Sequence, residues 1–246
     1  MIIVNNSLVR ASRYCLVCVL LFLFQCFASK TAGVIAGFFD YSRFDSDNTF
    51  MYISIHHIFQ MLFALFLIFL ISHVKKIDFN LKPRFDNSGV LCCILFSIII
   101  FIYVVISYIV GYSMGTIAPY SYELNFINVF GTLAFQLFLS GVSEEILFRA
   151  LPITILKSVS NKNWKYSYFF CIFISSIFFA LAHIKWSLFP FSISYSMFQL
   201  VYAFILGLAY GYTYLKSKCI LYPMIMHGIS NFLMVGIGYI FSYFIM

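Results

Sequence analysis

Long apolar runs alternate with short polar segments along the whole chain. Seven of these runs approach or exceed the roughly 20 residues that a helix needs to cross the hydrocarbon core of a bilayer. Their apolar positions are continuous, whereas the strands of a membrane β-barrel alternate in polarity. The runs cover Tyr14–Ser29, Met51–Ser72, Val90–Tyr112, a stretch within Leu124–Leu156, Tyr166–His183, Phe191–Leu215 and Cys219–Phe244. We therefore predict an all-α integral membrane protein, a bundle of about seven transmembrane helices.

The composition excludes a soluble protein. Of the 246 residues, 63% are hydrophobic and only 9% are charged, whereas soluble domains carry about 25% charged residues. The polar segment Lys75–Ser88 divides the chain into two parts. We expect residues 1–88 to form two accessory transmembrane helices with polar loops, and residues 89–246 to form the core helices that carry the chemistry.

Lysine and arginine residues collect on alternate loops. Eleven lie before the first run or after the second, fourth and sixth runs, and three lie on the other loops. The eleven are Arg10, Arg13, Lys75, Lys76, Lys82, Arg84, Lys157, Lys162, Lys165, Lys216 and Lys218. The positive-inside rule then predicts a multi-pass protein of the plasma membrane, with a cytoplasmic N-terminus and an external C-terminus. This topology accounts for the net charge of +7, so we expect no nucleic-acid partner.

The first run also fits a signal peptide. Arg10 and Arg13 precede it, and Ala28 and Ser29 would stand near a cleavage site. Cleavage there would leave the later topology unchanged. The seven cysteines lie in or beside apolar runs, which is typical of small buried or lipid-facing residues rather than of a disulfide framework.

Three runs carry polar residues at depths from which lipid excludes them. A charged group at the centre of a membrane helix costs roughly 2.5–3.5 kcal/mol, so the three charges of the fourth run would together cost on the order of 8–10 kcal/mol against lipid. They must face the bundle interior or a wet cavity, which makes them candidates for a functional site. The clusters are Glu144-Glu145-x3-Arg149 in the fourth run, His183 in the fifth and His227-x3-Asn231 in the seventh.

Helical spacing gives the two glutamates different roles. At about 100° per residue, Glu145 and Arg149 lie about 40° apart and can form an ion pair. Glu144 lies about 140° from Arg149 and points elsewhere, without a partner. A lone carboxylate in a cavity of low dielectric is poorly solvated, which suits it to act as a base near neutral pH. We expect a structural Glu145 and a chemical Glu144.

The remaining polar residues supply donors. His227 and Asn231 share one helix face, and two donors on a rigid face are what an oxyanion hole requires. His183 comes from another helix and could hold a water molecule against Glu144. Pro152 is expected to kink the fourth helix and free a carbonyl group.

Each cluster also has a purely structural interpretation. Ion pairs such as Glu145–Arg149 lock bundles without catalysis, and His227 and Asn231 could simply hydrogen-bond across helices. His183 could be an interfacial histidine. We interpret His56 and His57, near the outer end of the second run, as interfacial. The combination of three clusters in one small protein favours function.

In this order, the three clusters resemble the motifs of the CPBP family, which comprises CAAX proteases and bacteriocin-processing enzymes and is also called the Abi or type II CAAX prenyl endopeptidase family. The family pattern is EExxxR, FxxxH and then HxxxN or HxxxD. The chain offers Glu144-Glu145-x3-Arg149, Phe179-x3-His183 and His227-x3-Asn231. The resemblance covers roughly residues 124–244 and implies an intramembrane endopeptidase whose substrate is a peptide or a membrane protein, with lipidated substrates among the candidates.

The resemblance also implies roles for the motif residues. It assigns water activation to Glu144 with His183, oxyanion stabilisation to His227 with Asn231, fixing of the helix to Glu145 with Arg149, and shaping of the site to Phe179. We favour a glutamate mechanism without a cofactor. Zinc held by Glu144, His183 and His227 is the minority interpretation, because no HExxH motif is present.

Two further functions remain open. One is a non-enzymatic membrane immunity factor or scaffold, and the other is an ion-coupled transporter that uses Glu144 as a proton or cation site.

The depth of the motif residues in the membrane sets a condition on the site. With Glu144 near mid-membrane, His183 would lie about 8 Å toward the outside, so a tilt or a shorter fifth crossing is needed to bring the two together. The sequence leaves the substrate open among a prenylated C-terminal peptide, a bacteriocin or pheromone precursor and another membrane protein.

Overall fold

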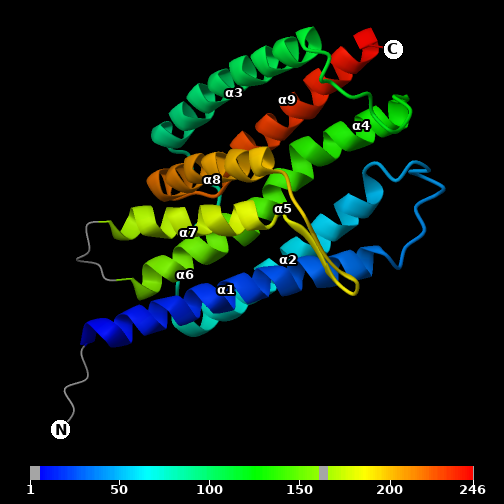
Figure 1. Cartoon of the computed structure of the whole chain (residues 1–246). Coiled ribbons are helices and arrows are strands. Elements are labelled where there is room, and N and C mark those ends of the chain that lie inside the picture. The colour runs from blue at the N-terminus through cyan, green and yellow to red at the C-terminus, as the bar shows by residue number, and fades with distance from the viewer. Residues whose placement is uncertain (1–5, 161–165, 246) are drawn as a thin grey trace.

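The chain folds as a bundle of long helices, shown by a computed structural model that describes residues 6–160 and 166–245. Successive passes run in alternating directions, so that the start of α1 and the end of α9 lie at opposite ends of the bundle (Figure 1). In chain order the elements are α1 Asn6–Ala36, α2 Met51–Lys75, α3 Asn87–Ser113, α4 Phe126–Ala134, the π-helical η1 Phe135–Ser140, α5 Gly141–Glu145, the π-helical η2 Ile146–Ala150, α6 Leu151–Val159, α7 Ser167–Leu181, β1 Lys185–Leu188, β2 Phe191–Ser194, α8 Met197–Ser217 and α9 Leu221–Ile245.

The helices confirm an all-α membrane bundle. Within the described residues, six helical stretches are long and apolar enough to cross a membrane, and residues 126–159 form one of them. The seventh apolar helix, α7, has 15 residues. At 1.5 Å per residue it spans about 22 Å, which is shorter than the roughly 30 Å hydrocarbon core.

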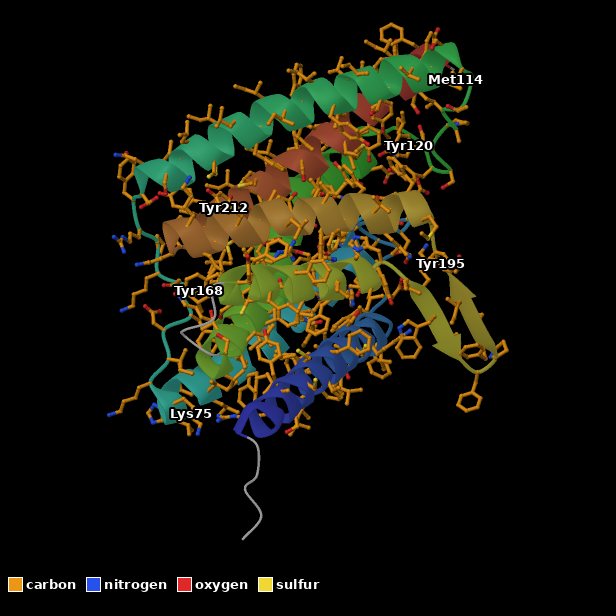
Figure 2. All side chains as sticks on the ribbon, turned by 60° about the vertical axis from the view of Figure 1, so that its left-hand side comes forward. Lys75, Met114, Tyr120, Tyr168, Tyr195 and Tyr212 are labelled. Carbon is orange, nitrogen blue, oxygen red and sulfur yellow. The ribbon has the colours of Figure 1, made fainter. Side chains whose placement is uncertain are left out.

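The two ends of the bundle differ as the loop charges predict. Lys75, Tyr168 and Tyr212 lie at one end, and Met114, Tyr120 and Tyr195 lie at the opposite end (Figure 2). The loops expected to be basic therefore gather at the end marked by Lys75. Two residues of that expected set, Lys162 and Lys165, lie outside the described residues.

The expected sixth helix begins later than the sequence indicated. Residues from Phe191 onward were expected to be helical, but Phe191–Ser194 is a strand that pairs antiparallel with Lys185–Leu188. Helix α8 begins only at Met197, where the Ser196 side chain accepts a hydrogen bond from the Gln199 N–H. The apolar and polar residues of β2 alternate with a period of two, which is the pattern of a strand.

The fourth pass is irregular where its polar residues lie. Two π-helical segments flank Gly141–Glu145, and such segments occur often at functional sites. Pro152 cannot donate a hydrogen bond to the carbonyl of Phe148, four residues earlier. The Ser175 hydroxyl of α7 donates to that carbonyl instead. The carbonyl group that Pro152 was expected to free is therefore the Phe148 carbonyl, and it accepts a hydrogen bond from α7.

Helices α1 and α2 pack together and against the fourth pass. Ala28, Ala32 and Ala36 are fully buried at four-residue spacing, and small residues at this spacing allow close helix packing. This stripe continues beyond the expected end of the first helix at Ser29. The buried Gln25 of α1 donates to the carbonyl of Leu147 at 3.4 Å.

A loop outside the membrane fixes the start of α2. The Asp45 carboxylate accepts hydrogen bonds from the N–H groups of Thr49, Phe50 and Met51. Burial raises the pKa of Asp45, but these hydrogen bonds outweigh burial and hold the pKa below its ordinary value. The Thr49 hydroxyl also contacts the Asn128 side chain of α4 at 3.4 Å. The start of α2 is thereby tied to the start of the fourth pass.

Helix α9 crosses the fourth pass at glycines. A Cβ atom on Gly228 would overlap the carbonyl of Leu137, and one on Gly141 would lie 2.7 Å from the Met224 carbonyl oxygen. This close crossing brings the polar residues of α9 next to those of α5.

We expect Gly228→Ala to lower the free energy of unfolding in detergent by about 1–3 kcal/mol, because overpacking pushes α9 away from the fourth pass. Gly236→Ala is the matched control on the same helix, since its Cβ would lie at 3.6 Å from the Leu133 side chain, an ordinary contact. Equal stability of the two variants would contradict the close crossing.

Candidate active site

The polar residues of the three motifs converge on one cavity of about 300 Å³. Its wall combines side chains from α2, the fourth pass, α7, α8 and α9. The expected residues that line it are Glu144, Phe179, His183, His227 and Asn231. The structure thus brings together residues that lie more than 80 positions apart in the sequence.

Behind this cavity lies a fully buried ion pair. Arg149 Nε lies 3.3 Å from Glu145 Oε2, and both side chains have an exposed fraction of 0%. The guanidinium carbon of Arg149 lies 4.2 Å from the ring centre of Phe179 and 5.4 Å from that of Tyr210. Arg149 is therefore held by one carboxylate and two aromatic faces, an arrangement in which cation–π attraction supplements the charge pair. The ion pair expected from the i,i+4 spacing is present.

The second oxygen of Glu145 orients His227. His227 Nδ1 lies 2.8 Å from Glu145 Oε1, and the Tyr210 ring stacks on the imidazole at 5.1 Å. The Tyr210 hydroxyl is hydrogen-bonded in turn to Ser230 at 2.8 Å. Glu145 therefore fixes both its own helix, through Arg149, and the imidazole of α9.

Glu144 lies between two imidazoles and is not isolated as the spacing suggested. Its Oε1 lies 3.6 Å from His57 Nε2, and its Oε2 lies 3.5 Å from His227 Nε2. Its side chain keeps an exposed fraction of 18%, whereas Glu145 has none. The helix geometry correctly separated Glu144 from Arg149, but it could not show which side chains other helices bring to Glu144.

His183 reaches the same cavity because α7 is short. The helix ends at Leu181, so His183 lies two residues beyond its last residue. Its Nδ1 lies 2.8 Å from the Phe179 carbonyl oxygen, and a carbonyl oxygen can only accept. Nδ1 must therefore carry the proton, which leaves Nε2 as an acceptor when the ring is neutral. A helix tilt or a shorter fifth crossing was needed to bring His183 to the depth of Glu144, and the structure contains the shorter crossing.

Asn231 connects α9 to the fourth pass. Its Nδ2 donates to Ser140 Oγ at 2.9 Å. An amide nitrogen carries two protons, so one donor remains for a ligand in the cavity that Asn231 lines.

Sequence reasoning misplaced His57, which was interpreted as interfacial. Its exposed fraction is 6%, and Nδ1 lies 2.6 Å from Ser143 Oγ of α5. The signal that could have revealed it is the spacing of the buried face of α2, formed by His57, Gln60, Ala64 and Ile68. Two polar residues on a stripe of helical period within an apolar run indicate a face turned toward the bundle.

The described side chains do not form the zinc site of the minority interpretation. Among the described residues, no group of three or more His, Cys, Asp or Glu side chains is placed to hold a metal ion. Glu144, His183 and His227 line one cavity, but their side chains do not converge on a common point as zinc ligands do.

The comparisons with known proteins agree with the motifs. Residues 126–233 match the family model described as type II CAAX prenyl endopeptidase Rce1-like. Neither the curated proteins nor the solved structures gave a match. The matched segment contains the fourth pass, α7, α8 and the first half of α9, whereas α1, α2 and α3 lie before it.

We expect Arg149→Met to lower the free energy of unfolding by about 3–5 kcal/mol, because it leaves the Glu145 carboxylate buried without its cation. The double variant Arg149→Met with Glu145→Gln should recover part of this loss, since it removes both charges. Arg43→Met, on an exposed arginine, is the control and should stay within about 0.5 kcal/mol. Unfolding measured in detergent checks the series, and an Arg149→Met protein as stable as the control would contradict a structural ion pair.

Proposed function

From the match of residues 126–233 to the type II CAAX prenyl endopeptidase family model, we propose that the chain is an intramembrane endopeptidase of the glutamate type, in which Glu144 activates the attacking water molecule. The match supports a membrane protease at the level of the family. The observation that best supports the finer proposal is the position of Glu144, partly exposed to a cavity and flanked by imidazole nitrogens at 3.5 and 3.6 Å.

The first step is the attack of water. A water molecule between Glu144 and His183 gives a proton to the Glu144 carboxylate, and its oxygen forms a bond with the carbonyl carbon of the scissile peptide. The neutral His183 ring accepts the second hydrogen bond of that water at Nε2, because its Nδ1 proton is committed to the Phe179 carbonyl. General base catalysis of this kind contributes about 10²–10⁴-fold.

The second step is stabilisation and collapse of the tetrahedral intermediate. The negative charge forms on the former carbonyl oxygen, where the free N–H of Asn231 can donate. His227 can donate there too when protonated, because Glu145 already takes its Nδ1 proton. Glu144 then returns its proton to the departing amine as the C–N bond breaks, so the carboxylate is regenerated. In this mechanism every proton transfer uses groups of the protein, the substrate and one water molecule.

The proposed substrate is the C-terminal peptide of a lipidated protein. A larger cavity of about 900 Å³, lined mostly by apolar side chains, lies beside the catalytic cavity. The two cavities are lined by adjacent residues: His56 and Phe178 line the larger one, and His57 and Phe179 line the smaller one. Such a space suits an isoprenoid chain while the peptide enters the catalytic cavity.

The proposed setting is a plasma membrane, with the N-terminus on the cytoplasmic side. The gathering of the basic loops at the end of the bundle marked by Lys75 supports this orientation (Figure 2). Under this orientation the larger cavity lies toward the external end of the bundle, because Lys30, Tyr52 and Lys185 line it.

We expect Glu144→Gln to reduce cleavage of an internally quenched farnesylated peptide by about 10²–10⁴-fold in nanodiscs, because the amide cannot accept the proton of water. Its melting temperature should match wild type. Glu123→Gln, which changes an exposed loop glutamate, is the matched control and should retain full activity. A Glu144→Gln protein that cleaves at the wild-type rate would refute the assignment.

A further inference from the structure

His57 brings a third helix, α2, into contact with the proposed catalytic carboxylate of Glu144. It lies on α2, outside the segment that matches the family model. The ring is buried, with Nδ1 at 2.6 Å from Ser143 Oγ and Nε2 at 3.6 Å from Glu144 Oε1. The Phe135 ring meets it edge-on at 5.0 Å. The His57 ring therefore has one orientation and two polar contacts, both with α5.

The Ser143 hydroxyl determines which nitrogen of His57 carries the proton. Ser143 Oγ lies 3.0 Å from the Ser140 carbonyl oxygen, which can only accept, so we assign the single hydroxyl proton to that contact. Ser143 Oγ is then an acceptor toward His57 at 2.6 Å. With this assignment the proton of a neutral His57 sits on Nδ1, which leaves Nε2 with a lone pair that faces Glu144.

His227 is constrained in the same way from the other side. Its Nδ1 faces Glu145 Oε1 at 2.8 Å, and the other oxygen of Glu145 faces Arg149 Nε at 3.3 Å. The proton of a neutral His227 is therefore also on Nδ1, and its Nε2 lone pair faces Glu144 Oε2 at 3.5 Å.

An ionised Glu144 between two neutral rings would face a lone pair on each side. Carboxylate oxygens only accept, so neither contact would then be a hydrogen bond. One additional proton converts a contact into a charge-assisted hydrogen bond, either as a protonated ring beside a carboxylate or as a carboxylic acid beside a neutral ring. A proton shared between Glu144 and one of its two imidazoles would turn a contact between two acceptors into a favourable one.

We infer that His57 is a positioning residue of this site, which shares a proton with Glu144 and thereby holds Oε1 toward α2 while Oε2 remains with His227. The inference rests on the proposed function. With one oxygen held by His57, the plane of the carboxylate is fixed, and the second oxygen is presented to the cavity for the incoming water. The titratable groups that surround the His57 ring are Glu144 of α5, His227 of α9 and the neighbouring His56 of α2.

Two substitutions of His57 separate its two contacts. In His57→Asn the amide reaches the position of Nδ1 and keeps the bond to Ser143, but nothing reaches Glu144. In His57→Gln the amide reaches the position of Nε2 and donates to Glu144 without titrating. His73→Asn makes the same exchange at an exposed position of the same helix and is the matched control.

We expect His57→Asn to lower kcat for the farnesylated peptide by about 10–100-fold with KM within about twofold, because misplacement of a catalytic group costs up to about 10²-fold. His57→Gln should recover part of kcat, and both variants should shift the acid limb of the pH–rate profile. The control should behave as wild type. Wild-type kcat and an unchanged pH profile in His57→Asn would overturn the inference, as would a His57→Gln protein no better than the Asn variant.

A second measurement does not depend on activity. Nitrogen-15 NMR of histidine-labelled protein in nanodiscs reports the protonation of each ring nitrogen, and the signal lost in His57→Gln identifies His57. The expected result is a proton on Nδ1 of His57. In Ser143→Ala, which lacks the hydroxyl partner of Nδ1, part of the signal should move to the form protonated on Nε2. A His57 protonated only on Nε2 would overturn the inference. A wild-type protein that cleaves no peptide but shows the expected tautomer would count against the proposed function while the His57–Ser143 arrangement stands.

Discussion

The buried ion pair between Glu145 and Arg149 is the interaction on which the rest of the site depends. Its two charges have no exposed surface, so each is tolerable only because the other is present. One oxygen of Glu145 holds Arg149 and the other holds His227. The pair therefore fixes the fourth pass, orients an imidazole of α9 and leaves Glu144 as the carboxylate that reaches the cavity. Glu145 of the charge pair and Glu144, the carboxylate that we propose as the base, thus occupy adjacent positions of the fourth pass.

The surrounding fold brings the other helices within reach of these two glutamates. Gly141 and Gly228 allow α9 to cross the fourth pass closely. The loop around Asp45 ties the start of α2 to α4, and the short α7 ends where His183 can enter the cavity. Each of these features positions a helix that carries a side chain of the proposed site. The accessory helix α2 thus contributes to the site through His57.

Much of this arrangement could be predicted from the sequence, because membrane depth makes polar residues conspicuous. The helical runs, the Glu145–Arg149 pair and the three motif clusters follow from hydropathy and from the spacing of i,i+4 positions. The strand at Phe191–Ser194 could not be recognised from hydropathy, because it stands in an apolar run long enough for a membrane helix and its alternation covers only four residues. The neighbours of Glu144 could not be predicted, because contacts between α2, α5 and α9 depend on how helices rotate and pack. His57 shows this limit, since its depth alone suggested an interfacial residue.

The proposed role of Glu144 as the base for a water molecule is tested most directly by isotope labelling in a single turnover. Excess protein would cleave the farnesylated peptide in water enriched in oxygen-18, and mass spectrometry would locate the label. Direct attack by water predicts oxygen-18 in the new carboxylate of the peptide product and none in the Glu144 side chain. Label in Glu144 with an unlabelled product would show that the carboxylate attacks the substrate itself, and would contradict the proposed mechanism.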